Sequence, residues 1–162
     1  MSSNEIDLLR RLIETIADHP GPIVEIGTLI GRTTTEIAIA DAGRHKIITV
    51  DNYSWNPWRL TFEQHVAAAD QVLRYLMESG LVERHISDKE SFFAEYAGQA
   101  PSLVLLDAKH TYEATKLDIE WARKVNAQIV CGHDYAPDWP GVMKIVDELG
   151  GPTHLADTLW VL

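Results

Sequence analysis

The chain has 162 residues, of which 46% are hydrophobic and 23% charged, and its formal net charge is −10. This length and composition are typical of one globular domain, so we expect residues 1–162 to form a single domain. With only 14 Lys and Arg, we expect no nucleic-acid partner, because phosphate contacts need basic side chains. No apolar stretch approaches the roughly 20 residues that cross a bilayer, so no membrane partner is expected either.

The single cysteine, Cys131, rules out an intrachain disulfide. Its apolar neighbours Ile129 and Val130 indicate a buried core thiol. The first 20 residues are charged and amphipathic and lack the apolar segment of a signal peptide. We therefore expect a cytoplasmic location.

Short apolar runs alternate with helical patterns along the chain. In chain order, the periodicity predicts a helix over 2–17, a strand over 23–26, a turn over 27–31, a helix over 33–42, a strand over 46–50, a helix over 62–79, a weak strand over 83–87, a short helix over 91–96, a strand over 103–106, a helix over 112–125, a strand over 128–132, a helix over 140–149 and two short strands within 153–162. Ser2 with Glu5, and Thr33 with Glu36, match the capping box that opens a helix.

Continuously apolar strands separated by helices indicate a parallel sheet that is covered on both faces. We predict an α/β fold: a Rossmann-like, doubly wound, mostly parallel seven-stranded sheet with helices on both faces and a C-terminal antiparallel strand. Ligands bind outside the carboxyl ends of the strands in such sheets. The polar and aromatic residues of this sequence are concentrated at those ends, in segments 25–32, 51–59, 87–89, 107–112 and 133–139.

The first of these segments carries Glu-x-Gly-Thr-x-x-Gly, from Glu25 to Gly31, between a strand and a helix. Its glycines allow a ligand to approach the backbone closely, although a plain strand–helix turn is the alternative. The G-x-G-x-x-G dinucleotide fingerprint is absent and Glu25 would repel a pyrophosphate, which disfavours a nicotinamide-dependent oxidoreductase. Asp51, at the end of the second strand, suits two ribose hydroxyls; its alternative role is a helix or turn cap.

The fourth and fifth strands end in Leu-Asp-Ala-Lys-His-Thr-Tyr and Gly-His-Asp-Tyr. Because neighbouring strand ends meet, Asp107 and Asp134 are expected within reach of one ion, and oxygen ligands favour Mg²⁺. His110 is placed to take a proton from a hydroxyl that such an ion activates; a solvated histidine is the alternative.

Aromatic side chains crowd the loop from Tyr53 to Trp58, and Trp139 follows the fifth strand. They are expected to form a lid over a ligand or, alternatively, to pack as ordinary loop residues. In the helix over 112–125, Leu117 and Trp121 are expected to face inward, and Trp160 is expected in the core.

In this order and at strand ends, the motifs resemble the class I S-adenosylmethionine (SAM)-dependent methyltransferases. Trp-Pro-Gly-Val, from Trp139, adds to the likeness. The nearest group is that of small-molecule O-methyltransferases, which includes macrolide-sugar O-methyltransferases and cephalosporin-hydroxylase-like proteins. The resemblance covers the chain from about residue 23 to 162.

The resemblance implies a role for each motif residue. The residues that would line the methionine and ribose side of SAM are Glu25, Gly27, Thr28 and Gly31. Asp51 and Asn52 would lie at the ribose, Asp88 at the adenine and Asp107 beside the cofactor. Asp107 and Asp134 would bind Mg²⁺, and His110 would be the general base. The family often has two adjacent carboxylates where this sequence has His133-Asp134, so we count His133 among the metal candidates; its Asp-Gly-x-His is Asp-Ala-x-His here.

The expected function is SAM-dependent methyl transfer to a hydroxyl of a small-molecule acceptor, assisted by Mg²⁺. The alternative is a non-catalytic or repurposed SAM-binding Rossmann-like protein. The sequence is compatible with a homo-oligomer.

Overall fold

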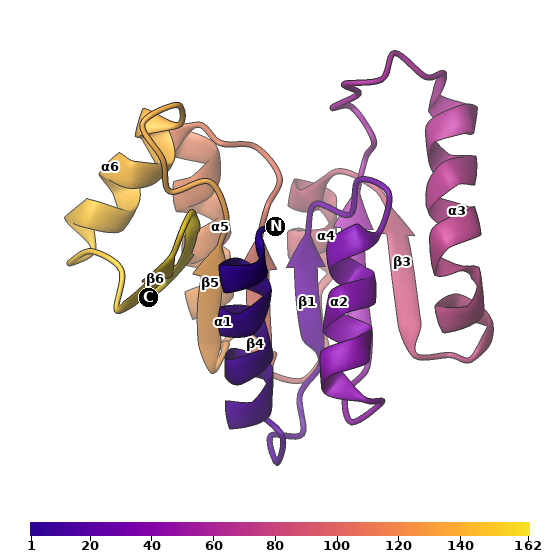
Figure 1. The fold of residues 1–162 in the computed structure, drawn as a ribbon, viewed down its shortest axis with the longest axis horizontal. Coiled ribbons are helices and arrows are strands. Elements are labelled where there is room, and N and C mark those ends of the chain that lie inside the picture. The colour runs from indigo at the N-terminus through magenta and orange to yellow at the C-terminus, as the bar shows by residue number, and fades with distance from the viewer.

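The computed structural model describes residues 1–162 (Figure 1). Its strands are β1 (Ile23–Ile26), β2 (Ile47–Asp51), β3 (Val82–Ile86), β4 (Leu103–Leu106), β5 (Ile129–Gly132), β6 (His154–Ala156) and β7 (Leu159–Val161). Its helices are α1 (Ser3–Thr15), α2 (Arg32–Asp41), α3 (Phe62–Glu78), α4 (Lys89–Glu95), α5 (Tyr112–Lys124) and α6 (Pro140–Glu148).

The strands form one seven-stranded sheet in the order β3-β2-β1-β4-β5-β7-β6. Strands β1 to β5 are parallel, whereas β7 is antiparallel to both β5 and β6. This differs from the usual dinucleotide-binding order 3-2-1-4-5-6 by the insertion of β7 between β5 and β6. The predicted fold is confirmed, and β7 is the antiparallel strand.

Alternate strand residues pack into two cores, one on each face of the sheet. Ile23 of β1 joins a cluster with residues of α1 and α2, and α3 packs beside α2. Its neighbour Val24 joins a second cluster with residues of α4, α5 and α6. Figure 1 shows α1 and α2 in front of the sheet and α4 and α5 behind it. No helix of the structure has both the length and the apolar character needed to cross a membrane.

The turn after β1 depends on two glycines with positive φ. Gly27 has φ 108°, and a Cβ on it would lie 2.1 Å from the carbonyl oxygen of Asp107. The turn therefore passes directly against the end of β4. Gly31 has φ 84° and caps α2 without a side-chain hydrogen bond, so the expected capping box of Thr33 and Glu36 is wrong and the helix begins at Arg32.

At single residues, most local predictions are confirmed and one is wrong. The Ser2–Glu5 capping box of α1 is confirmed. Trp121, Trp160 and Cys131 are buried, as expected. Leu117 is 39% exposed, so the prediction that it faces inward is wrong.

Candidate functional site

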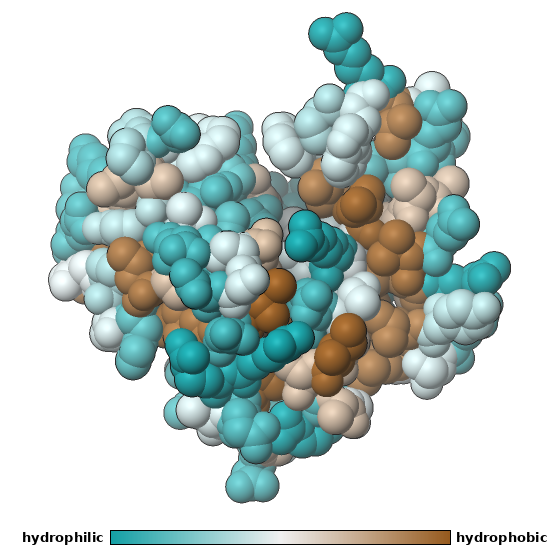
Figure 2. All heavy atoms as spheres, viewed as in Figure 1, coloured by the Kyte–Doolittle hydropathy of each residue, from teal (hydrophilic) through white to brown (hydrophobic).

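A cleft of about 980 Å³ lies at the carboxyl ends of the parallel strands. Figure 2 shows the surface hollowed at the top of the view, the edge to which β1 and β3 point in Figure 1. All five segments expected at the strand ends contribute to its lining. Pockets for small ligands commonly measure roughly 300–1,000 Å³, so this cleft is large enough for a nucleoside-sized ligand and an acceptor.

The cofactor residues expected from the sequence divide into two groups. Gly27, Thr28, Asp51, Asn52 and Asp107 line the cleft, as expected of a binding surface. The lining does not include Glu25, Gly31 or Asp88.

Asp88, which the sequence placed at the adenine, is the N-cap of α4. Its carboxylate accepts hydrogen bonds from the backbone nitrogen of Ser91 at 2.8 Å and from that residue's hydroxyl at 3.0 Å. These bonds also hold the pKa of Asp88 below its usual value. The structure therefore places this carboxylate in a helix cap.

Asp51 is fixed by the backbone on both sides of its strand end. Its Oδ2 accepts from the nitrogen of Leu29 at 2.7 Å, and its Oδ1 accepts from the nitrogen of Tyr53 at 2.7 Å. Each carboxylate oxygen can accept two hydrogen bonds, so each retains one acceptor position. The carboxylate thus caps two turns and still offers two oxygens to the cleft.

Glu25 lies fully buried behind the turn. Its Oε2 accepts from the hydroxyls of Thr34 and Thr49, while Oε1 has no partner. Burial raises the pKa of Glu25 to about 8; the two threonine hydrogen bonds oppose the rise, and the neighbouring Asp107 and Asp51 add to it. The side chain is therefore largely protonated at neutral pH and acts from behind the cleft rather than at its surface.

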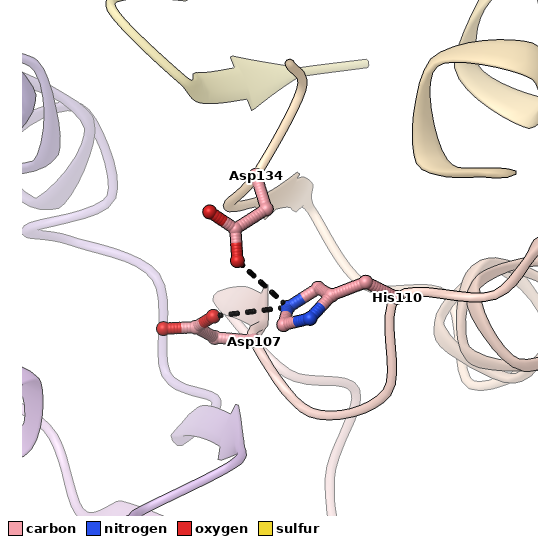
Figure 3. Close-up of side chains that lie close together, drawn as sticks. All are labelled: Asp107, His110 and Asp134. Atoms are coloured by element: carbon pink, nitrogen blue, oxygen red, sulfur yellow. Dashed lines mark ion pairs between the residues drawn. The ribbon is translucent and has the colours of Figure 1, made fainter. Parts of the chain in front are cut away.

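Asp107 and His110, which follow β4, meet Asp134, which follows β5, in the lining of the cleft (Figure 3). Nε2 of His110 lies 3.0 Å from Oδ2 of Asp134 and 3.4 Å from Oδ1 of Asp107. One possible metal-ligand atom of each residue lies within 4.8 Å of the corresponding atoms of the other two residues. The buried Nε2 of His110 has no hydrogen-bond partner. Asp134 adopts φ 64°, a conformation uncommon for a residue with a Cβ that often marks a functional site.

Both ring nitrogens of His133, a metal candidate expected from the sequence, have partners in the structure. Nδ1 lies 3.1 Å from Oδ1 of Asp134, and Nε2 lies 3.1 Å from both Oε1 of Glu5 and the hydroxyl of Thr158. Burial opposes protonation, but the hydrogen bond to Asp134 and the charges of Asp107, Asp134 and Glu5 raise the pKa of His133 to about 9. The group whose possible metal-ligand atoms lie close together in the structure is Asp107, His110 and Asp134.

Sequence reasoning missed the contribution of Glu5 to this side of the cleft. Glu5 is buried at the start of α1 and accepts from the nitrogen of Thr158 at 3.0 Å and from its hydroxyl at 2.7 Å. Burial would raise its pKa, yet these bonds, with those from Ser2 and the charge of His133, lower it to about 2. No local pattern could reveal the contact, because the partners are 153 residues apart.

The predicted aromatic residues border the cleft. Trp55, Trp58 and Trp139 line it with 63%, 47% and 40% of their surfaces exposed. Trp139 also packs on the ring of His110, with ring centroids 4.7 Å apart. Tyr53 is instead buried against His65. Basic side chains not singled out from the sequence also line the cleft; they are Arg32, Lys89 and Lys109.

A family model described as a methyltransferase domain matches residues 24–135. The chain belongs to this methyltransferase domain family. The resemblance drawn from the motifs is therefore confirmed. No curated protein gives a sequence match to the methyltransferase.

Solved structures similar to this methyltransferase include several O-methyltransferases. The calicheamicin methyltransferase CalS11 is 18% identical, with 97% of this chain and 77% of that chain covered and a TM-score of 0.73. TomG from Streptomyces achromogenes, involved in tomaymycin synthesis and solved with SAM, is 19% identical (99% and 78% covered, TM-score 0.68). An O-methyltransferase from Bacillus cereus, solved with SAH, is 16% identical (99% and 79% covered, TM-score 0.69). At these identities the likeness establishes the shared fold.

Proposed function

We propose that this methyltransferase uses SAM to methylate a hydroxyl of a small molecule, with the assistance of a divalent cation. One observation carries the proposal: a single cleft joins Asp51, a carboxylate with two free acceptor positions, to the group of Asp107, His110 and Asp134. Similar structures described as O-methyltransferases, two of them solved with SAM or SAH, support it.

The binding half of the reaction falls to the turn after β1 and the end of β2. Asp51 would accept hydrogen bonds from the two ribose hydroxyls, with Asn52 beside it. Gly27 has no side chain to obstruct the ligand, and the turn abuts Asp107. The cofactor would thus extend from Asp51 toward Asp107, which brings its methyl group to the reactive side of the cleft.

The reactive half needs a base, because an alcohol at neutral pH is a poor nucleophile. Nε2 of His110 faces the two carboxylates. Nδ1 is therefore the nitrogen that is left to take the proton from the hydroxyl of the methyl acceptor. The charge of Asp134, 3.0 Å away, would favour a proton on Nε2 and hence this tautomer. Trp139 restricts the ring further by packing on it.

The donor set of this group fits a divalent cation. Asp107 and Asp134 supply carboxylate oxygens, the ligands that Mg²⁺ prefers and that also suit Mn²⁺. A cation held there would lower the pKa of the acceptor hydroxyl. A neutral histidine bound through Nε2 keeps its proton on Nδ1, so His110 serves as ligand or as base, and we assign it the base.

Calorimetry and a transfer assay test the proposal together. SAH should bind with one site per chain, whereas NAD should give no heat. Methyl transfer from radiolabelled SAM to a panel of small hydroxylated acceptors should require His110. Binding of NAD in place of SAH would contradict the proposal. Full transfer activity in His110→Ala would contradict the assignment of the base.

A further inference from the structure

A chain of contacts runs from the middle of β3 to the carboxylate of Asp51. Nη1 of Arg84 donates to the hydroxyl of Tyr53 at 3.2 Å, and the backbone nitrogen of Tyr53 donates to Oδ1 of Asp51 at 2.7 Å. Nη2 of Arg84 donates to Asp70 of α3, and the side chain of Arg84 is 7% exposed. The carboxylate at the end of β2 is thus tied, through Tyr53, to the adjacent strand and to the helix that packs against it.

Tyr53 adopts a backbone conformation that a bulky residue seldom takes. Its φ is 56°, in the left-handed region. Such a conformation is unfavourable and persists where the surrounding contacts impose it. At Tyr53 these are the hydrogen bonds with Asp51 and Arg84. The ring also packs edge-on against buried His65, with ring centroids 5.0 Å apart. The strained residue therefore lies directly beside a carboxylate of the cleft, and strain of this kind clusters at functional sites.

The loop that follows β2 has two parts with different surroundings. Trp55 and Trp58 line the cleft and are 63% and 47% exposed. Tyr53 is 4% exposed and lies outside the cleft lining, so it is not placed to touch a ligand. A contribution of Tyr53 to binding therefore passes through the residue of the lining that it holds, which is Asp51.

Resting on the proposed use of SAM, we infer that Tyr53 and Arg84 are positioning residues that fix the orientation of the Asp51 carboxylate for the two ribose hydroxyls. Leu29 holds Oδ2 of this carboxylate and Tyr53 holds Oδ1, so the group does not turn freely. Two adjacent hydroxyls need both oxygens at once, and a carboxylate fixed in advance meets them with little loss of side-chain freedom. Without the contact from Arg84, Tyr53 can relax to an ordinary backbone conformation and release Oδ1.

The test compares two ligands on variants that remove the contact between Arg84 and Tyr53 from either end. Calorimetry would measure the affinities of SAH and of the SAH analogue that lacks both ribose hydroxyls. Arg84→Met removes the guanidinium and keeps a linear apolar side chain. Tyr53→Phe removes only the hydroxyl and keeps the buried ring, so it covers the case in which Arg84→Met does not fold. The matched control is Arg74→Met, because Arg74 also donates to a tyrosine hydroxyl, that of Tyr75 at 3.3 Å, but on the exposed surface of α3.

The expected result is a change in the preference between the two ligands. Wild type and Arg74→Met should bind SAH about tenfold or more tightly than the analogue, because both ribose hydroxyls donate to a charged acceptor. Arg84→Met and Tyr53→Phe should lower this preference by about threefold or more, while their affinity for the analogue stays within about twofold of wild type.

The contradicting results separate this inference from the proposed function. A merely structural role would weaken both ligands equally, and that result would overturn the inference. An undiminished preference in both variants would overturn it as well and leave the use of SAM intact. If wild type binds the two ligands equally, Asp51 does not hold the ribose, and the inference fails with that assignment. If wild type binds neither ligand, the proposed function fails, and this inference fails with it.

Discussion

The two sides of the cleft are built differently. On the β1–β2 side, Thr28 and Asp51 are held by short hydrogen bonds from the backbone and from buried hydroxyls. On the β4–β5 side, Asp107, His110 and Asp134 meet through ion-pair contacts, and 18–27% of each side chain is exposed. The side chains of Thr28 and Asp51 have hydrogen-bond partners before any ligand arrives, whereas Nε2 of His110 is buried without one.

This difference suits a division of labour between binding and chemistry. A surface that recognises a cofactor binds it more tightly when its hydrogen-bond acceptors are already fixed, because few side chains then lose conformational freedom on binding. A reacting group gains from a charged environment and an unsatisfied nitrogen, which are unfavourable until a ligand completes them. Substitutions on the two sides should therefore separate affinity from rate.

The largest expected effect lies on the β4–β5 side. His110→Ala should lower methyl transfer by about 10²–10⁴-fold, the usual contribution of a general base. Its affinity for SAH, measured by calorimetry, should stay within about threefold of wild type. His154→Ala, at an exposed histidine of β6, is the matched control and should retain both. A loss of SAH affinity as large as the loss of rate would erase the distinction between the two sides.

Removal of the divalent cation should come next in size. EDTA should lower turnover to the level of Asp134→Ala, and Mg²⁺ or Mn²⁺ should restore it, because the cation would contribute several kcal/mol of charge stabilisation. The same treatment of Asp138→Ala, an exposed aspartate outside the cleft lining, should behave as wild type. Unchanged turnover in EDTA, with His110→Ala inactive, would leave a metal-independent enzyme that relies on its histidine.

On the β1–β2 side, Glu25 should make stability depend on pH. Its pKa is about 8 in the fold against 4.5 as the ordinary value, so the unfolded chain releases a proton that the folded chain keeps. The stabilising contribution is complete below pH 4.5 and is lost as the pH rises to 8. Urea unfolding should show wild type losing on the order of a few kcal/mol relative to Glu25→Gln across this window. Parallel pH curves for the two proteins would mean that Glu25 is ionised in the fold.

Asp51→Ala should weaken SAH binding by roughly 1.5–3 kcal/mol, since the ribose hydroxyls would lose a charged acceptor. At saturating SAM, its turnover should fall less than that of His110→Ala. Asp18→Ala, an exposed aspartate in the turn after α1, is the control for calorimetry. Unaltered SAH affinity in Asp51→Ala would remove this residue from the cofactor site.

The smallest effect should appear in the loop that borders the cleft. Residues 53–58 carry two tryptophans that line the cleft with much of their surface exposed. Loops beside active sites commonly close over ligands, so SAH should slow amide hydrogen exchange in this segment. The segment 97–101, outside the cleft lining, serves as the reference. Equal exchange with and without SAH would count against a lid.

The fold was largely predictable because its signals are local. Apolar strands such as Leu103–Leu106 are buried on both faces and carry the pattern of a central parallel strand. The exceptions arose where tertiary contacts override a local motif. Thr33 matches a capping box, yet Gly31 takes the cap because the preceding turn folds back through its hydrogen bond to Thr28.

Part of the membership of the candidate site was predictable from the sequence, but its chemistry was not. Strand ends identified Asp51, Asp107 and Asp134, since parallel strands bring those ends together. The environment of His133 depends on Glu5, which α1 brings close to it as that helix packs beside β6. The burial of Glu25 likewise depends on α2 covering its face of the sheet. Neither environment leaves a trace in the neighbouring sequence.

A crystal structure with SAH would test the central claim most directly. The account predicts density in the cleft, with the ribose hydroxyls on Asp51 and the sulfur facing the side that holds His110. Density for SAH elsewhere, or with its ribose away from Asp51, would contradict the account.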